Sequence, residues 1–451
     1  MTKSSNDVLA PNGALMPDDM TGFQIGVIAL CVCLAGLDGF DVLAIAYTAP
    51  AIAHGWALKP FMLGELFSAG LAGMGVGALL IAPLGDRLGR RPVVLLSLVL
   101  LCVFMFASGF TGTLAQLVLM RFCTGLGIGG MLANINVIAS EYASAPRREL
   151  CVALMSVGYP IGATLGGMAA VLIIHADRWP GVFLFGGLVA LVLLPVVYFS
   201  LPESLAYLAA RQPVHALARI NRLRVRLGQD ELPALPRLIA AHEAEPRDIL
   251  AIFRPGALGT TTVAAFLYFS VMATAYFLLS WTPKLLTDLG LSVQGGISGA
   301  LMINIGGTIG CILYGFYAGR LGVRRLAVAF MLGLCAMTLS FGVLPAQSAL
   351  LMLAALGLGF CLHTSITVLY VVVPTVFPAA IRATGTGFAM SMGRLGAVFG
   401  PLLAGWFMSG GYGRPVYCAA LALPMLAAII CLYGLPSLGR PAPVTATEPA
   451  E

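Results

Sequence analysis

The sequence predicts an all-α integral membrane protein with twelve transmembrane helices in two six-helix halves. Of its 451 residues, 59% are hydrophobic and only 10% are charged, whereas a soluble domain carries about a quarter charged residues. Apolar segments of about 20 residues, the length that crosses a bilayer, recur along the chain. The basic residues between these segments alternate from one side to the other. These observations exclude a soluble fold.

Twelve apolar segments are long enough to be spanning helices. We place them near residues 23–52, 60–83, 92–111, 114–139, 148–174, 180–200, 258–285, 294–318, 325–345, 347–375, 383–409 and 414–436. A polar stretch rich in arginine and proline separates the sixth segment from the seventh. The expected domains are a tail over 1–22, an N-terminal half over 23–200, a linker over 201–257, a C-terminal half over 258–436 and a tail over 437–451.

The distribution of the 25 lysines and arginines predicts the orientation. Nineteen lie on the side of the N-terminus, four on the other side and two inside spans. Because basic residues are retained on the cytoplasmic face, both termini are expected in the cytoplasm. A charge divided in this way argues against nucleic-acid binding. The ten cysteines lie in apolar stretches without CxxC pairs, so we expect neither a disulfide framework nor a metal site.

Two aspartates, Asp38 and Asp41, lie in the middle of the first apolar segment. Their spacing places both carboxylates on one face of a helix. A carboxylate at this depth is costly unless it meets water, a cation or a proton. The pair therefore predicts a proton or cation pathway. The alternative is that both acids join neighbouring helices through hydrogen bonds.

A basic loop recurs at equivalent places in the two predicted halves. Residues 84–91 read LGDRLGRR after the second span, and residues 317–325 read YAGRLGVRR after the eighth. Repetition of a loop in this way indicates duplication of a six-helix unit. The first loop, with the two six-span halves, resembles the marker of the major facilitator superfamily, which implies that superfamily's fold. The copies depart from the marker at Gly319, where aspartate is common, and at Ala82, where glycine is usual.

Further motifs make the chain similar to the aromatic acid:proton symporter family of that superfamily. They follow the expected order: Asp38-Gly39-Phe40-Asp41, Arg121 to Gly130, Asn134 with Ser140-Glu141-Tyr142, Ser280-Trp281-Thr282-Pro283, Arg382 to Gly387, Gly393-Arg394 and Gly400-Pro401. One departure is Ala133, where the family often has proline before the asparagine.

The residues and the resemblance together predict a proton symporter that imports an aromatic or ring-derived carboxylate by alternating access. The resemblance implies a bacterial inner (plasma) membrane, with the proton gradient as driving force and no cofactor. The expected partners are a small carboxylate, the proton and the bilayer. The chain has no Gly-x-x-x-x-Gly-Lys-Ser/Thr motif for nucleotide phosphates, no catalytic triad and no metal-ligand cluster. We therefore do not expect an enzyme.

Proton coupling is predicted for Asp38, Asp41 and Arg121. With a rise of about 1.5 Å per residue, Asp38 and Arg121 fall at similar depths in a core of about 30 Å. An arginine stays charged at any biological pH, whereas an aspartate can be neutralised. Protonation of Asp38 could therefore free Arg121 to hold a substrate carboxylate. A permanent structural ion pair is the alternative.

Substrate binding is predicted for Arg394, His363, Asn134, Tyr276 and Trp281. A guanidinium suits bidentate recognition of a carboxylate, although Arg394 could instead cap carbonyls in the glycine-rich helix around it. An imidazole titrates near neutrality, yet His363 could equally be a packing residue. Asn134 could bind a substrate hydroxyl or join two helices.

Aromatic side chains within or near the ends of spans are further candidates. Such residues usually form interfacial belts or core packing, but one or two in a cavity would stack on a ring-shaped solute. The candidates are Tyr47, Tyr159, Tyr268, Tyr276, Trp281 and Tyr370.

Three charged residues, Asp86, Arg90 and Glu141, lie at the predicted cytoplasmic ends of spans two to four. The resemblance implies that they form a gating clasp. This role concerns conformation and not substrate binding. The alternative is that their charges only set the topology.

Other functions stay open. An efflux exchanger for amphipathic drugs is one, although residues 158–162 (GYPIG) only partly resemble the fifth-span pattern of drug–proton exchangers, which favours uptake. A symporter for a non-aromatic ring-cleavage acid or a lactone is another. A receptor that binds without transport is disfavoured because the linker is too short for a signalling domain.

Overall fold

The computed structural model describes residues 20–174, 178–235, 249–321, 323–345, 348–378 and 381–433. Every regular element in these ranges is a helix, and eleven of the helices are long and apolar enough to cross a membrane. A twelfth, α15 (Arg414–Tyr433), is a shorter apolar helix at the position of the last predicted span. The predicted all-α fold with twelve spans is confirmed.

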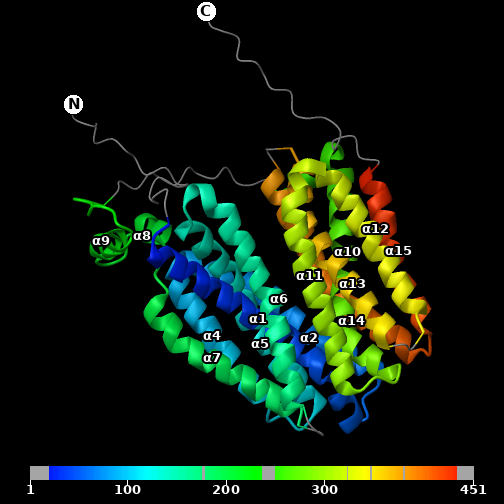
Figure 1. The fold of residues 1–451 in the computed structure, drawn as a ribbon. Coiled ribbons are helices and arrows are strands. Elements are labelled where there is room, and N and C mark those ends of the chain that lie inside the picture. The colour runs from blue at the N-terminus through cyan, green and yellow to red at the C-terminus, as the bar shows by residue number, and fades with distance from the viewer. Residues whose placement is uncertain are drawn as a thin grey trace, which may run out of the picture.

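The long helices form two groups of six, which lie side by side in Figure 1. The N-terminal group is α1 (Gly22–Gly55), α2 (Pro60–Leu80), α4 (Arg90–Ser108), α5 (Leu114–Tyr142), α6 (Arg148–Ile173) and α7 (Pro180–Ser200). The C-terminal group is α10 (Pro255–Asp288), α11 (Val293–Leu321), α12 (Val323–Val343), α13 (Ser348–Val376), α14 (Arg382–Ser409) and α15. The short elements are η1 (Ala82–Leu84), α3 (Gly85–Leu88), η2 (Ala145–Arg147), α8 (Leu205–Arg211), α9 (Ala216–Arg226) and η3 (Ile249–Phe253).

The first and seventh spans are longer than the sequence predicts. Helices α1 and α10 have 34 residues each, so each is about 51 Å long and exceeds a bilayer core of about 30 Å. Helix α10 begins at Pro255, inside the predicted linker. Of the predicted tails and linker, residues 1–19, 437–451 and 236–248 lie outside the described ranges.

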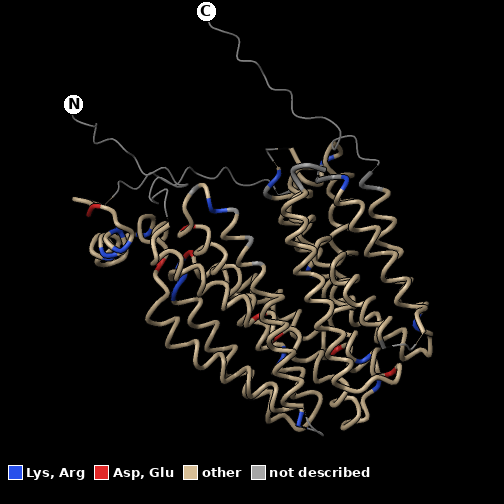
Figure 2. Tube along the Cα trace, in the orientation of Figure 1, with Lys and Arg blue, Asp and Glu red and all other residues tan. Residues whose placement is uncertain are grey.

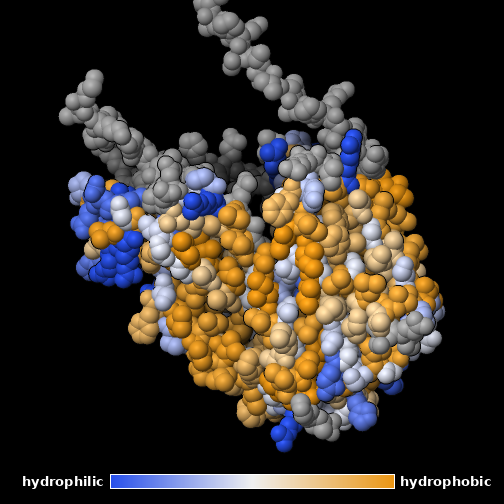
Figure 3. Space-filling view, viewed as in Figure 1, coloured by the Kyte–Doolittle hydropathy of each residue, from blue (hydrophilic) through white to orange (hydrophobic). Residues whose placement is uncertain are grey.

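Helices α8 and α9 lie at one end of the bundle, which we name the linker end (Figure 1). Figure 2 shows most charged residues near the two ends of the bundle. In the described residues, two hydrogen bonds join helices of the two halves, and both link α2 with α14. Ser68 Oγ donates to the Val398 carbonyl at 2.6 Å, and the Phe61 amide donates to Ser409 Oγ at 2.9 Å. These contacts lie toward the opposite end, whereas Figure 3 shows a notch between the halves at the linker end.

Two glycines set the distance between helices that carry candidate site residues. Gly39 of α1 lies against the carbonyl of Tyr159 in α6, and Gly396 of α14 lies against the carbonyl of Phe269 in α10. A Cβ atom at either position would overlap that carbonyl. Glycine therefore permits the close helix approach that fixes these two pairs of helices.

We expect Gly39→Ala to lower the melting temperature of the purified protein. The added methyl group must displace the α6 backbone, and overpacking of this kind costs about 1–3 kcal/mol. Gly75→Ala is the matched control, because a Cβ at this position in α2 meets nothing within 4 Å. Thermal unfolding in detergent measures both variants. A Gly39→Ala protein as stable as the control would show that α1 and α6 do not pack this closely.

Candidate functional site

A buried ion pair joins α1 to α5 inside the N-terminal half. The two terminal nitrogens of the Arg121 guanidinium donate to the two carboxylate oxygens of Asp41, each at 2.7 Å, and one of them also donates to the Asp41 carbonyl at 3.0 Å. Both residues are 1% exposed. Phe183 of α7 covers the guanidinium, with its ring centroid 5.6 Å from the guanidinium carbon. Bidentate geometry of this kind gives a strong, specific charge pair.

The carboxylate of Asp38, one helical turn before Asp41, has a different environment. Asp38 is 4% exposed, and its Oδ1 atom has no hydrogen-bond partner among the described residues. The charges of Asp41 and Arg394 both act on it, so it lies within reach of a cation from the C-terminal half. A buried oxygen without a partner is costly. Asp38 is therefore free to take up a proton or to contact a ligand.

The predicted pairing of Asp38 with Arg121 is wrong, because Arg121 binds Asp41. The two aspartates differ in depth by only about 4.5 Å, at a rise of 1.5 Å per residue. Helix α1 is longer than a bilayer core, so counting from its end does not fix the level of either aspartate. The structure still brings Asp38, Asp41 and Arg121 together: Arg121 binds Asp41, and Asp38 lies one helical turn away on α1.

Arg394 lies near the middle of α14, on a different side from the glycines that pack against α10. Gly393 and Gly396 are buried in that packing, whereas Arg394 is exposed. The charge of Arg394 acts on Asp38 and on Tyr276 of α10. The guanidinium therefore lies near Asp38 of the other half. None of the described residues forms an ion pair with it, so its donors are available for an anion.

A connected set of tyrosines accompanies these charges. Tyr159 of α6 interacts with Asp38 and Tyr276, and Tyr276 interacts with Tyr370 of α13. The rings of Tyr268 and Tyr370 stand edge to face, with centroids 6.2 Å apart. The hydroxyl groups of Tyr159 and Tyr268 are buried without a partner in the described part of the chain. The set therefore places aromatic rings and two hydroxyl groups without partners near these charges.

We name these residues the central cluster: Asp38, Asp41, Arg121, Tyr159, Tyr268, Tyr276, Tyr370 and Arg394. The sequence predicts Tyr276 for this site, but it does not separate Tyr159, Tyr268 and Tyr370 from aromatic packing residues. No sequence signal distinguishes a tyrosine at a cavity from one in a helix interface.

His363 lies between α11 and α13, inside the C-terminal half. Its ring contacts Gly307 of α11 and interacts with the backbone of Gly359 in its own helix. The residue is 8% exposed, and neither ring nitrogen has a hydrogen bond of ordinary geometry among the residues described. These contacts place His363 in a helix interface. Its role in substrate binding stays a prediction.

Two residues that the sequence predicts for substrate binding, Asn134 and Trp281, contact protein groups outside the central cluster. Asn134 Nδ2 donates to the Ala82 carbonyl at 3.3 Å, so Asn134 joins α5 to the connection between α2 and α4. The Trp281 indole N–H donates to the Pro401 carbonyl at 3.1 Å, and its ring stands 5.2 Å from that of Phe67 in α2. Asn134 therefore joins helices of one half, and Trp281 packs where the halves meet and lines a pocket there. Their roles in substrate binding stay predictions.

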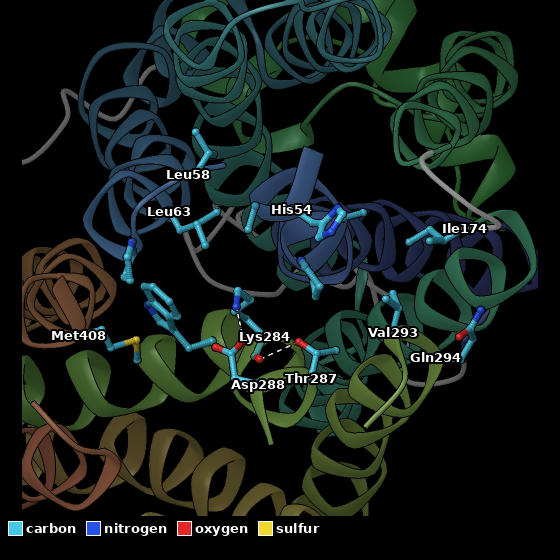
Figure 4. Close-up of a pocket in the computed structure, with 15 residues that line it drawn as sticks. His54, Leu58, Leu63, Ile174, Lys284, Thr287, Asp288, Val293, Gln294 and Met408 are labelled. Carbon is cyan, nitrogen blue, oxygen red and sulfur yellow. Dashed lines mark hydrogen bonds and ion pairs between the residues drawn. The ribbon is translucent and has the colours of Figure 1, made fainter. Parts of the chain in front are cut away.

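A pocket of about 520 Å³ marks the boundary between the halves at the opposite end (Figure 4). His54 of α1, Lys284 and Asp288 of α10, Gln294 of α11 and Met408 of α14 are among the residues that line it. Lys284 and Asp288 form an ion pair in its wall. The pocket therefore receives side chains from both halves.

The predicted group of Asp86, Arg90 and Glu141 comes together at the linker end. Arg90 forms one ion pair with Glu141 and another, at 3.6 Å, with Asp86. The Arg90 and Glu141 side chains are 14% and 18% exposed, whereas that of Asp86 is 75% exposed. The contact between Arg90 and Glu141 is therefore the better shielded from solvent. Ser204 Oγ donates to the second Glu141 oxygen at 2.6 Å, which brings the chain after α7 into the group.

Glu203 belongs to the same group, although the sequence does not predict it. Its Oε1 atom accepts from the backbone amides of Arg90 and Arg91, at 2.8 and 3.2 Å. These amides lie in the first turn of α4, where N–H groups lack helical partners and a negative charge is favourable. The preceding Gly89 has φ +104°, a conformation open to glycine. The available sequence signal is a single acid directly after an apolar span.

The fold and the two groups of charged residues define a class of protein: a multi-pass membrane transporter built from two similar halves. Residues 28–345 and 305–450 match the model of the Major Facilitator Superfamily. The gallate transporter of Pseudomonas putida is 33% identical over 418 residues, which are 92% of each chain. The 4-hydroxybenzoate transporter PcaK of Pseudomonas aeruginosa is 30% identical over 430 residues, covering 93% of this chain and 94% of the relative.

A third relative, the 3-(3-hydroxy-phenyl)propionate transporter of Escherichia coli, is 31% identical over 414 residues, covering 91% and 93% of the two chains. Among solved structures, a partially occluded inward open form of the xylose transporter XylE from E. coli superposes with a TM-score of 0.72 at 17% identity. That match covers 93% of this chain and 100% of the other. The chain belongs to the major facilitator superfamily and, within it, to the aromatic acid:proton symporter family. It is a membrane transporter and not an enzyme.

We expect Asp41→Asn to destabilise the purified protein much more than Asp38→Asn. Loss of the Asp41 charge leaves the Arg121 guanidinium buried without a counter-charge, which costs on the order of 3–5 kcal/mol. Asp38 has no such partner to lose. Thermal unfolding of both variants in one detergent tests the difference. The double variant Asp41→Asn/Arg121→Gln should recover part of the loss, and equal stability of the two single variants would contradict the assigned pairing.

Proposed function

We propose that this chain is a proton-coupled secondary transporter that imports an aromatic carboxylate by alternating access. The observation that carries the proposal is the position of Asp38. Its carboxylate is buried and lacks a partner on Oδ1, and it lies within reach of Arg394 in the other half. An acid in this position links the protonation of Asp38 in the N-terminal half to the binding of an anion by Arg394 in the C-terminal half.

Asp38 is the proton acceptor in this proposal. Asp41 is less suited, because both of its carboxylate oxygens already accept hydrogen bonds from Arg121. A deprotonated Asp38 competes with a substrate carboxylate for the attraction of Arg394. Protonation of Asp38 removes this competition, and it also removes the repulsion between the Asp38 carboxylate and the substrate carboxylate. Proton binding and substrate binding are therefore coupled.

The substrate carboxylate binds Arg394, and the tyrosines of the central cluster receive the ring. Guanidinium donors match the two oxygens of a carboxylate, and aromatic side chains favour stacked or edge-to-face contact with a ring. The free hydroxyl groups of Tyr159 and Tyr268 can bind a ring hydroxyl. The relatives named for gallate and 4-hydroxybenzoate carry substrates of this kind. These features favour an aromatic acid over a non-aromatic ring-cleavage acid, which has no planar face to stack.

We place the linker end in the cytoplasm and the protein in the inner (plasma) membrane, with both termini inside. The excess of basic residues at this end supports the orientation. Arg90 and Glu141 hold α4 and α5 together there, next to the start of the linker. We propose that Asp86, Arg90 and Glu141 act in the conformational change and not in substrate binding. Rocking of one half against the other would open the central cluster alternately to the two sides.

Asp38→Asn should abolish substrate accumulation driven by a proton gradient. The amide cannot take up and release a proton, so the coupling is lost while the binding site keeps its shape. Uptake of radiolabelled 4-hydroxybenzoate into proteoliposomes with an acidic exterior measures this. Exchange of labelled for unlabelled substrate without a gradient should persist in the variant.

Glu65→Gln is the control for this experiment, because Glu65 is an exposed carboxylate in spanning helix α2, outside the central cluster. It should accumulate substrate like the unmodified protein. Normal accumulation by Asp38→Asn would sink the proton role of Asp38. Counterflow of a cationic amphipathic drug by the unmodified protein, with no response to aromatic acids, would instead support an efflux exchanger.

We expect Arg394→Lys to raise the KM for an aromatic acid about tenfold or more. A lysine keeps the charge but loses the paired donors of the guanidinium, and a charge-assisted hydrogen bond is worth about 1.5–3 kcal/mol. Initial rates of uptake at increasing substrate concentration give the KM. Arg414→Lys is the control, because Arg414 lies at the start of α15 and donates to the carbonyls of Gly342 and Leu344 at the end of α12. An unchanged KM in Arg394→Lys would remove Arg394 from the binding site.

A further inference from the structure

Helix α9 has one buried face and one basic face. The buried side chains on this helix are those of Ala216, Ile220 and Leu223. Three exposed arginines lie on another side, spaced by three and four residues, so that they share one face of the helix. We name them the arginine stripe: Arg219, Arg222 and Arg226. The apolar face already packs on the protein, whereas the stripe points outward.

The arginine stripe has no carboxylate partner in the part of the chain that the structure describes. Arg226 lies over the ring of Phe23, 5.6 Å from its centroid, which does not neutralise its charge. Arg222 and Arg226 line a hollow of about 660 Å³ with Asn221 and Glu231, and neither arginine forms an ion pair with Glu231 by the usual distance. The stripe is therefore a positively charged surface without ion-pair partners among the described residues.

Helix α9 lies beside the bundle at its linker end. Figure 1 looks nearly along the axis of α9, whereas the spanning helices run across the view. The helix therefore lies across the direction of the spans, as a helix in the plane of a membrane surface does. Figure 3 shows its hydrophilic surface next to the apolar surface of the N-terminal half. Tyr198 and Phe199, at the linker end of α7, are 53% and 79% exposed, and such aromatic residues are typical of the headgroup level.

We propose that the arginine stripe binds the headgroups of anionic phospholipids in the leaflet at the linker end. The partner is identified by three features: a basic amphipathic helix, its orientation in the membrane plane, and exposed aromatic residues at the same end. Guanidinium groups bind phosphate oxygens in a bidentate manner, and each basic residue near an anionic surface contributes on the order of fivefold to binding. The lipid contact fastens the N-terminal half to the surface of the bilayer. This inference does not depend on which solute the protein carries.

The test compares lipid binding by the full-length protein and by Arg219→Gln/Arg222→Gln/Arg226→Gln. Each purified protein in detergent is titrated with phosphatidylglycerol or phosphatidylcholine, and native mass spectrometry counts the bound lipid. The unmodified protein should retain phosphatidylglycerol in preference to phosphatidylcholine. The triple glutamine variant should bind phosphatidylglycerol on the order of a hundredfold more weakly, since three contributions of roughly fivefold multiply, with phosphatidylcholine unchanged.

Two further variants keep the test decisive. Arg219→Lys/Arg222→Lys/Arg226→Lys retains the charge and should keep most of the preference. Lys59→Gln/Arg178→Gln removes exposed basic residues at the opposite end and should keep all of it. The proposal is overturned if the glutamine variant keeps the preference, or if it loses both lipids equally. It is also overturned if inorganic phosphate, at the same concentration as the lipid, displaces phosphatidylglycerol, because the site would then be a general anion site.

Discussion

A guanidinium buried in a membrane-spanning helix keeps its charge, so the surrounding structure must supply a counter-charge. In this protein Asp41 does so for Arg121, with both carboxylate oxygens engaged and both residues 1% exposed. The pair joins α1 to α5, and Phe183 covers it from α7. Three helices of the N-terminal half therefore converge on one charge pair. The approach of α6 to the same part of α1, through Gly39, adds the fourth.

The Asp41 pair gives Asp38 its distinct character. Both aspartates lie on one helix, but Arg121 is used by only one of them, and the other keeps an oxygen without a partner. The C-terminal half provides the complementary group, Arg394, on a helix packed closely against α10. Each half thus supplies one uncommitted charge of opposite sign to the space between them. A site divided in this way responds to the relative position of the two halves.

The sequence predicts the number of spans and the two halves correctly, because a bilayer imposes apolar length on every spanning helix. It underestimates the lengths of α1 and α10. It also predicts the association of Arg90 with Asp86 and Glu141, since a conspicuous charged loop carries it. It does not predict which aspartate binds Arg121, because one helical turn is finer than a depth estimate from helix ends. Asn134 and Trp281 stay predictions for substrate binding. Both side chains also hydrogen-bond to nearby carbonyls, and such internal partners leave no mark in the sequence. The role of Glu203 is not predicted for the same reason, because its partners are backbone amides.

The charges within the central cluster have an electrical consequence for the proposed cycle. Two aspartates and two arginines sum to zero when Asp38 is deprotonated and no substrate is bound. One proton and one monovalent carboxylate again add zero. The central cluster would then be neutral both when empty and when it holds a proton and a substrate. Neither conformational change of the cycle would move net charge of the cluster across the membrane voltage. Transport would be electrically silent, and the pH difference alone would set how far the acid accumulates.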